Sequence, residues 1–234
     1  MRRHFPLLLL VTLCASLAAA IGAMIVEPYY AHRLSALFGF EGKSHTVVAH
    51  GRMADAAFAR RAGHGPAVAL AFHGASTIEG LDVRAFGPGA VNHAVGGARL
   101  ADAAGRIERF DRATPNIILL AGFNDLASGD GPTELNAQLT AILTARTPDQ
   151  SLIVVGILPV AAGTAPGGVT NAQIEAANQT MGQTCRGARL CQFIDPMALT
   201  WAAADYVDDG VHLTPEGYRE LQRMLKTALA EESP

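Results

Sequence analysis

Short, continuous apolar runs recur along the chain and constrain its fold more than any other feature. Three of them have the length of strands that are buried on both faces, namely Ala67–Phe72, Asn116–Ala121 and Ser151–Ile157. A weaker fourth run, QFID, ends at Asp195. Because strands of this kind occur in parallel sheets that are covered on both faces, the runs predict such a sheet.

Segments with helical periodicity lie between these runs. One covers Leu100–Phe110, a second begins near Thr133, a third covers Asn171–Met181, and the last begins where Thr214 caps a helix and Pro215 occupies its first turn. This alternation predicts an α/β fold, a three-layer α/β/α sandwich with a mostly parallel sheet. Folds of this class place their active sites at the carboxyl ends of the strands.

Composition and charge narrow the class of protein. The 234 residues are 50% hydrophobic and carry a formal net charge of -3, which describes a globular chain rather than a disordered one. No block of like charge marks a basic surface, so we expect no nucleic-acid partner.

An uncharged apolar segment, Phe5–Val26, follows Arg2 and Arg3. Its length matches the roughly 20 residues that a membrane-spanning helix needs. Apart from a buried core helix, which the unbroken apolar length disfavours, it is either an uncleaved signal anchor, which the length favours, or a signal peptide cut after the alanines at 18–20. Both alternatives predict that the rest of the chain lies outside the cytoplasm, in the periplasm if the protein is bacterial.

We therefore expect three parts along the chain. Residues 1–26 form the signal anchor or signal peptide, and through an anchor the protein would have the membrane as a partner. Residues 27–65 form a juxtamembrane connection with one or two short helices, and residues 66–231 form the main domain.

Cys185 and Cys191 are close in sequence and would lie in an oxidising compartment. They form either a disulfide or two buried free thiols. A zinc site is not expected there, because no histidine or further cysteine accompanies them at ligand spacing.

Ser76 lies in the stretch AFHGASTIEG, just after the first apolar run. A serine hydroxyl is nearly inert at neutral pH unless a positioned base takes its proton. Ser76 is therefore either a nucleophile or a turn serine that caps the following helix.

A base for this serine is offered by the stretch YVDDGVHLTPEGY. Asp209 precedes His212 by three residues, a spacing that lets the carboxylate hold the imidazole in one orientation and tautomer. Asp208 and Asp205 remain alternatives as the orienting acid, and His212 itself has an alternative interpretation as a structural hydrogen-bonding residue.

Donors for a developing oxyanion are offered by two further stretches. Gly97 in VNHAVGGARL has a backbone N–H that can be approached closely, and Asn124 in LLAGFNDL has a carboxamide. Each also has a structural interpretation, as a turn glycine and as a loop cap.

Together the four clusters resemble the SGNH hydrolase family, also called GDSL esterases and lipases, from Ala67 to about Leu225. The resemblance implies the flavodoxin-like version of the α/β/α fold. It also implies a serine esterase, without cofactor or metal, that hydrolyses the carboxylic (acyl or O-acetyl) ester of a small molecule, a lipid or a glycan.

The resemblance assigns a role to each matching residue. Ser76 is then the nucleophile, and Asp209 with His212 completes the catalytic triad. Gly97 and Asn124, with the N–H of Ser76, are the donors of the oxyanion hole.

Two residues depart from the family pattern. The family usually has Asp where this chain has Ala75, and Gly where it has Ala94. These departures motivate an alternative, a non-catalytic carbohydrate- or acyl-binding module on the same fold. His73 and His93, which flank the same blocks, are interpreted as packing or substrate-wall residues rather than ligands.

Overall fold

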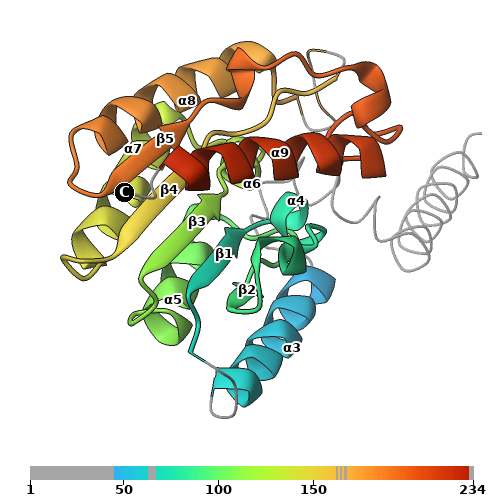
Figure 1. Ribbon diagram of the computed structural model, residues 1–234. Coiled ribbons are helices and arrows are strands. Elements are labelled where there is room, and N and C mark those ends of the chain that lie inside the picture. The colour runs from blue at the N-terminus through green and yellow to red at the C-terminus, as the bar shows by residue number, and fades with distance from the viewer. Residues whose placement is uncertain (1–44, 63–66, 162, 164, 166–167, 232–234) are drawn as a thin grey trace, which may run out of the picture. The chain divides into compact units, whose positions relative to one another are not determined.

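The computed structural model describes residues 45–62, 67–161, 163, 165 and 168–231 (Figure 1). The chain divides into two compact units, 1–49 and 50–234, and the second holds the sheet. Five strands form one parallel sheet in the order β2-β1-β3-β4-β5. Their bounds are β1 Leu70–Gly74, β2 Ala90–Asn92, β3 Asn116–Leu120, β4 Ser151–Val155 and β5 Cys191–Ile194.

Four of these strands fall where apolar runs predict them, although β1 begins three residues later than its run. The sequence pattern missed β2. This strand has only three residues and is half-buried at the edge of the sheet, so it has no continuous apolar run.

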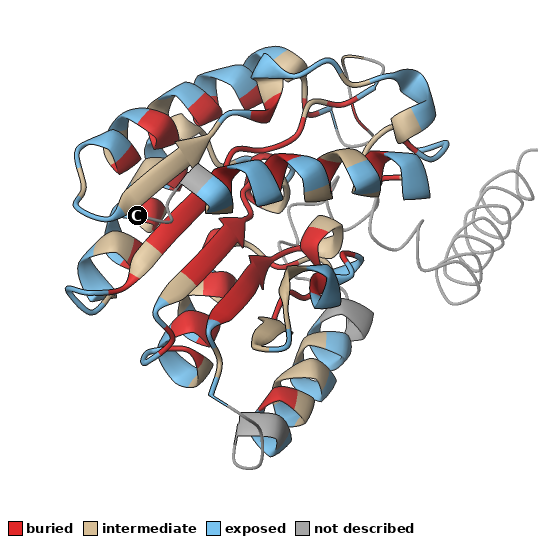
Figure 2. Cartoon of the chain, viewed as in Figure 1, coloured by how far each residue is buried: buried red, intermediate tan, exposed pale blue. Residues whose placement is uncertain are grey.

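Helices cover both faces of the sheet, which confirms the three-layer fold (Figure 1). On one face, residues at alternate strand positions such as Ile117 and Leu119 pack against α5 Leu100–Phe110, α7 Pro132–Ala145 and α8 Asn171–Arg186. On the other, Ile118 and Leu120 pack against α4 Ser76–Glu79 and α9 Pro215–Glu231. Figure 2 shows the buried strands between the layers and the exposed outer side of α9.

The remaining short elements lie in the connections. They are α6 Phe123–Leu126 and three 3-10 helices, η1 Val83–Phe86, η2 Pro196–Ala198 and η3 Ala203–Asp205. The start of α9 follows the expected pattern, because Thr214 Oγ1 accepts a hydrogen bond from the Gly217 N–H at 3.3 Å and Pro215 is the first helical residue. This cap fixes the chain two residues after His212.

Helix α3, His45–Ala62, lies within the stretch expected to be a connection. From His50 onward it packs on the domain: Phe58 is buried against the rings of His93 and Phe110, and Asp55 accepts a hydrogen bond from Arg106 Nε at 2.8 Å. The expected segment 1–26 lies outside the described residues. Among the helices that are described, none combines the length and apolar character needed to cross a membrane.

A disulfide joins Cys185, near the end of α8, to Cys191 at the start of β5. Cys185 is fully buried in the core beside α7 and α8. The bond therefore closes the short turn that leads from α8 into the last strand.

We predict that the double variant Cys185→Ala/Cys191→Ala loses about 2 kcal/mol of unfolding free energy, because the cross-link restricts the unfolded chain. Urea unfolding with and without a reductant measures this. Reductant should lower the stability of the wild type toward that of the variant and leave the variant unchanged. A wild type that is insensitive to reductant under unfolding conditions would contradict the prediction.

Candidate active site

The candidate site lies where the order of the sheet reverses. From β1 the chain moves outward to β2, and it then returns to the other side of β1 to form β3. Parallel sheets bind ligands in the crevice at such a switch point, beyond the carboxyl ends of the strands. Ser76 follows the end of β1, and Asn124 follows the end of β3.

The structure brings Ser76, His212 and Asp209 into one hydrogen-bonded chain. Ser76 Oγ lies 2.8 Å from His212 Nε2, and His212 Nδ1 lies 2.6 Å from Asp209 Oδ2. An ionised carboxylate can only accept, so His212 Nδ1 carries the proton and Nε2 is left to accept from the Ser76 hydroxyl. The His212 side chain is 47% exposed, so a substrate can reach it.

Asp209 is held in an acceptor position by the backbone. Its Oδ1 accepts the N–H groups of Val211 and His212, each at 2.9 Å. Burial acts to raise the pKa of Asp209, but the hydrogen bonds from His212 and Val211 outweigh it, so this pKa is lowered. The carboxylate is therefore ionised at neutral pH.

The two alternative acids occupy other positions. Asp205 Oδ2 accepts the Ala202 N–H at 2.7 Å, and Asp208 is exposed. Asp209 is the residue that the structure places against the His212 ring.

The loop that follows β2 leaves one backbone N–H without a partner in the described part of the chain. Three N–H groups donate to backbone carbonyls: His93 to Phe72, Val95 to Gly74, and Ala98 to Val95. Two donate to side chains: the Ala94 N–H to Asn92 and the Gly96 N–H to Glu79. Between His93 and Ala98, only the Gly97 N–H has no partner among the described residues. Buried or tightly packed loops seldom leave a donor unused, so this N–H is available for a ligand oxygen.

Glycine at positions 97 and 96 suits the geometry of this loop for two different reasons. Gly97 has φ +74°, a backbone conformation that side chains other than glycine rarely adopt. A Cβ at Gly96 would lie 2.9 Å from Glu79 Oε2 and 3.9 Å from the Ser76 Cβ. A side chain at residue 96 would therefore displace the Glu79 carboxylate, whereas its distance from Ser76 is that of an ordinary van der Waals contact.

Asn124, in α6, is oriented toward the same loop. Its Nδ2 donates to the Ala98 carbonyl at 2.9 Å. An amide nitrogen has two hydrogens, so the second can donate to a ligand. Ser76 is the first residue of α4, and its own N–H consequently lies outside the hydrogen-bond ladder of that helix.

The two departures from the family pattern are small buried residues. Ala75 is the N-cap of α4 and makes no side-chain cap, whereas Asp at an N-cap usually accepts a helix N–H. Ala94 packs in the core beside α4 and α9. Neither residue contacts His212 or Asp209 through any hydrogen bond of the structure.

His73 and His93 are joined by Asp111, a residue that the sequence did not single out. His73 Nε2 and His93 Nδ1 lie 2.8 and 2.5 Å from Asp111 Oδ2, and Thr114 Oγ1 donates to Asp111 Oδ1 at 2.9 Å. All three ring and carboxylate groups are buried. The two histidines are thus packing residues rather than parts of a substrate wall.

These three residues do not surround a common metal position. Tetrahedral zinc ligands at about 2.1 Å from the ion are separated by roughly 3.4 Å, which is longer than both distances to Asp111 Oδ2. His73 Nδ1 has no hydrogen-bond partner, whereas a metal-bound histidine usually donates its second N–H. The groups are therefore bonded to one another and link β1 to the end of α5.

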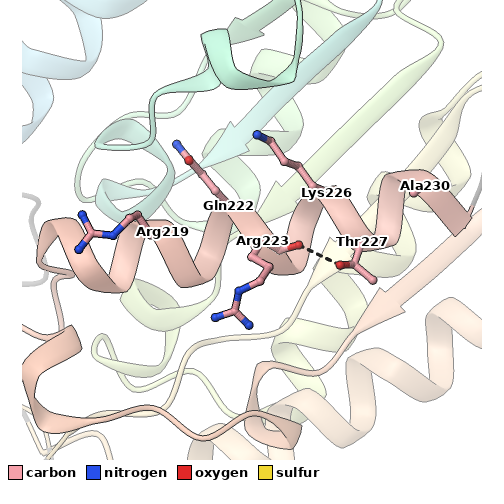
Figure 3. A pocket seen from close by; sticks show the side chains of 6 residues that line it. All are labelled: Arg219, Gln222, Arg223, Lys226, Thr227 and Ala230. Carbon is pink, nitrogen blue, oxygen red and sulfur yellow. Dashed lines mark hydrogen bonds between the residues drawn. The ribbon is translucent and has the colours of Figure 1, made fainter.

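Figure 3 shows a pocket on the outer surface of α9. It is lined by residues of this helix alone, namely Arg219, Gln222, Arg223, Lys226, Thr227 and Ala230. Two of its cations are paired within the helix, Arg219 with Glu216 and Arg223 with Glu220. It contains none of the residues around Ser76 and is not the candidate active site.

Comparison with known proteins decides the family. The family model described as GDSL-like Lipase/Acylhydrolase matches residues 55–220. The chain belongs to this family. The expected resemblance is therefore confirmed, and membership in a lipase and acylhydrolase family implies hydrolase activity.

Solved structures show the same fold. A Streptococcus pneumonia structure whose name refers to platelet activating factor has a TM-score of 0.69 and 21% identity, covering 85% of this chain and 99% of its own. A GDSL-like lipase from Bacteroides thetaiotaomicron has a TM-score of 0.64 and 18% identity, and the match covers 78% of this chain and 98% of the lipase chain. The catalytic domain of Streptococcus pneumoniae peptidoglycan O-acetyltransferase A has a TM-score of 0.58 and 16% identity, and the match covers 71% of this chain and 95% of that domain. The comparison with curated proteins gave no match.

The buried His73–Asp111–His93 cluster predicts loss of stability in acid. Burial lowers the pKa of His73, and its hydrogen bond to Asp111 opposes this only in part. Below about pH 6.5 the unfolded chain therefore binds a proton at His73 that the folded chain does not. Burial acts to raise the pKa of Asp111, but the bonds from His73 and His93 hold it well below its usual range. Both groups therefore stabilise the fold at neutral pH and cease to do so as the pH falls, His73 first.

We expect the unfolding free energy of the wild type to fall between pH 7.5 and 5.5, by up to about 1.4 kcal/mol per pH unit from His73. Urea unfolding across this range measures the slope, and His73→Gln is the comparison because it removes the titrating ring. The variant should be less stable at pH 7.5 and lose less on acidification. Parallel slopes for the two proteins would rule out His73 as the source.

Proposed function

We propose that this chain is a serine esterase that hydrolyses a carboxylic ester through Ser76, His212 and Asp209. The observation that supports this most is the hydrogen-bonded chain from Ser76 Oγ to His212 and on to Asp209, with distances of 2.8 and 2.6 Å. This is the arrangement that activates a serine hydroxyl.

The reaction follows from these contacts. His212 Nε2 takes the proton of Ser76 as its Oγ attacks the acyl carbon of the ester. The tetrahedral intermediate collapses, His212 returns the proton to the leaving alcohol, and the acyl group stays on Ser76. Water, deprotonated by His212, then releases the acid and restores the serine.

Asp209 and the amide donors act on the charges that form. Asp209 holds the Nδ1–H tautomer of His212 and stabilises the imidazolium. The N–H groups of Gly97 and Ser76 and the Asn124 amide donate to the anionic oxygen. Each fixed donor of this kind contributes roughly 2.7 to 4 kcal/mol to lowering the barrier.

We predict that Ser76→Ala lowers hydrolysis of short-chain aryl esters by at least about a thousandfold, because among the described residues no other hydroxyl is bonded to His212. Thr144→Ala is the matched control, since it removes an exposed hydroxyl on α7 that bonds only within its helix. Initial rates of the purified proteins measure the effect. Wild-type activity in Ser76→Ala would refute the assignment.

A fluorophosphonate probe separates this proposal from the alternative of a non-catalytic carbohydrate- or acyl-binding module. Peptide mass spectrometry should locate the label on Ser76. A folded protein that stays unlabelled would support the binding module instead.

Once labelling is established, the hydrolysis rate is measured against acyl chain length. A steep preference for acetyl indicates an acetyl ester substrate, and a rate that rises with chain length indicates a lipid substrate.

We further propose that the domain works outside the cytoplasm. The uncharged segment Phe5–Val26 and the disulfide between Cys185 and Cys191 both support this, because disulfides persist in oxidising compartments. A C-terminal alkaline phosphatase fusion in a bacterial host should be active, since this reporter needs export to form its own disulfides. The proposal would be contradicted if the phosphatase fusion were inactive and a separate C-terminal fusion to a fluorescent protein were fluorescent in the same host.

A further inference from the structure

Glu79 contacts two separate parts of the protein with its two carboxylate oxygens. Oε2 accepts the backbone N–H of Gly96 at 3.0 Å. Oε1 lies 2.6 Å from Nε2 of His50, in helix α3. The carboxylate therefore bridges the loop that presents the Gly97 N–H and a helix that precedes the sheet in sequence.

The position of Glu79 is set by the same helix that positions Ser76. Glu79 is the last residue of the four-residue helix α4, and Ser76 is the first. Residues three apart lie on the same side of a helix, one turn from each other. The nucleophile and the acceptor for the Gly96 N–H thus move as one unit.

The Gly96 contact adds to the support of the loop. On either side the backbone is already fixed, because the Val95 N–H donates to the Gly74 carbonyl at 3.1 Å and the Ala98 N–H donates to the Val95 carbonyl at 3.0 Å. Glu79 adds a second hydrogen bond to the peptide unit between Val95 and Gly96, whose carbonyl already accepts from Ala98. The next peptide unit along the chain carries the Gly97 N–H, so the orientation of the Val95–Gly96 unit limits where that N–H points.

Helix α3 is anchored independently of His50. Asp55 bonds to Arg106, and Phe58 packs on His93 and Phe110. These anchors bring His50 to Glu79, although the two side chains are half-exposed, at 51% and 37%. The anchored helix can therefore hold a surface carboxylate in one rotamer.

We propose that Glu79 is a positioning residue of the oxyanion loop, and that helix α3 maintains its working conformation through His50. The inference rests on the proposed esterase function, because its readout is that reaction. It assigns Glu79 no contact with substrate: the carboxylate acts through the Gly96 peptide. It also makes the segment before the sheet part of the active-site support rather than a connection alone.

The expected cost of losing Glu79 follows from the geometry of oxyanion stabilisation. Donors stabilise the transition state only when they lie close to the position that the oxygen will take. Without the carboxylate, the peptide unit between Val95 and Gly96 keeps only its bond from Ala98, and the Gly97 N–H that follows it is held less firmly. A misplacement of about 1 Å can reduce a rate by about a hundredfold.

The test compares Glu79→Ala with Glu79→Gln in the full chain. Alanine removes the acceptor, and we expect kcat to fall about tenfold or more with KM changed less than about twofold. Glutamine keeps an oxygen that accepts from Gly96, so its kcat should lie within about threefold of the wild type. Glu175→Ala is the control, because it removes an exposed glutamate of α8 that bonds only to Gln179.

A second pair of variants tests the contribution of α3. His50→Ala should lower kcat about threefold in the wild-type background. It should have no further effect in the Glu79→Ala background, because the contact between His50 and Glu79 is already absent there. Far-UV circular dichroism and urea unfolding check that each variant is folded. Additive effects, or no effect of His50→Ala, would overturn the assignment of α3.

The outcomes distinguish this inference from the proposed function. If Glu79→Gln is as slow as Glu79→Ala, or if Glu79→Ala has the wild-type kcat, the positioning role is wrong although Ser76→Ala is inactive. If Ser76→Ala remains active, the esterase assignment fails first. The inference stands only with an inactive Ser76→Ala, a slow Glu79→Ala and a rescued Glu79→Gln.

Discussion

The hydrogen bond between Ser76 and His212 joins residues that are 136 positions apart, and the rest of the site is arranged around it. It depends on the parallel sheet. The sheet ends β1 and β3 at the same edge, and α9 packs across one face so that its capped start presents His212 there. Local hydrogen bonds position the triad acid: Asp209 accepts two backbone N–H groups of its own turn and, with its other oxygen, contacts the imidazole. The proposed chemistry is thus a consequence of topology first and of side-chain identity second.

Residues without an assigned role in the reaction hold this geometry in place. Asp111 links His73, within β1, to His93, after β2, and so joins two strands just below the loops that contain Ser76 and Gly97. Glu79 works on the exposed side, between the Gly96 peptide and α3. A buried carboxylate is costly unless its bonds are complete, and Asp111 accepts three. The two carboxylates support opposite sides of the same loop, one from the core and one from the surface.

Much of the fold could be predicted from the sequence, because buried parallel strands and amphipathic helices have strong local patterns. Ser76, Gly97, Asn124, Asp209 and His212 could also be proposed as candidate site residues, since each lies in a short motif after a strand or before a helix. The half-buried edge strand β2 has no such pattern. Asp111 and Glu79 could not be identified because no local pattern marks them as partners of His73, His93 and Gly96, which lie 38, 18 and 17 residues from them. Only the spacing of Glu79, one helical turn after Ser76, offered a signal.

The most direct measurement is a crystal structure of the protein after reaction with a fluorophosphonate, whose phosphoryl oxygen stands in for the oxyanion of the intermediate. We predict a covalent bond from Ser76 Oγ to phosphorus and an oxygen about 2.7 to 3.1 Å from both the Gly97 N–H nitrogen and Asn124 Nδ2. We also expect this triad-bound adduct to leave Glu79 accepting the Gly96 N–H. An adduct whose oxygen points to solvent with neither donor in reach, or a phosphonate bound to any other residue, would contradict these predictions.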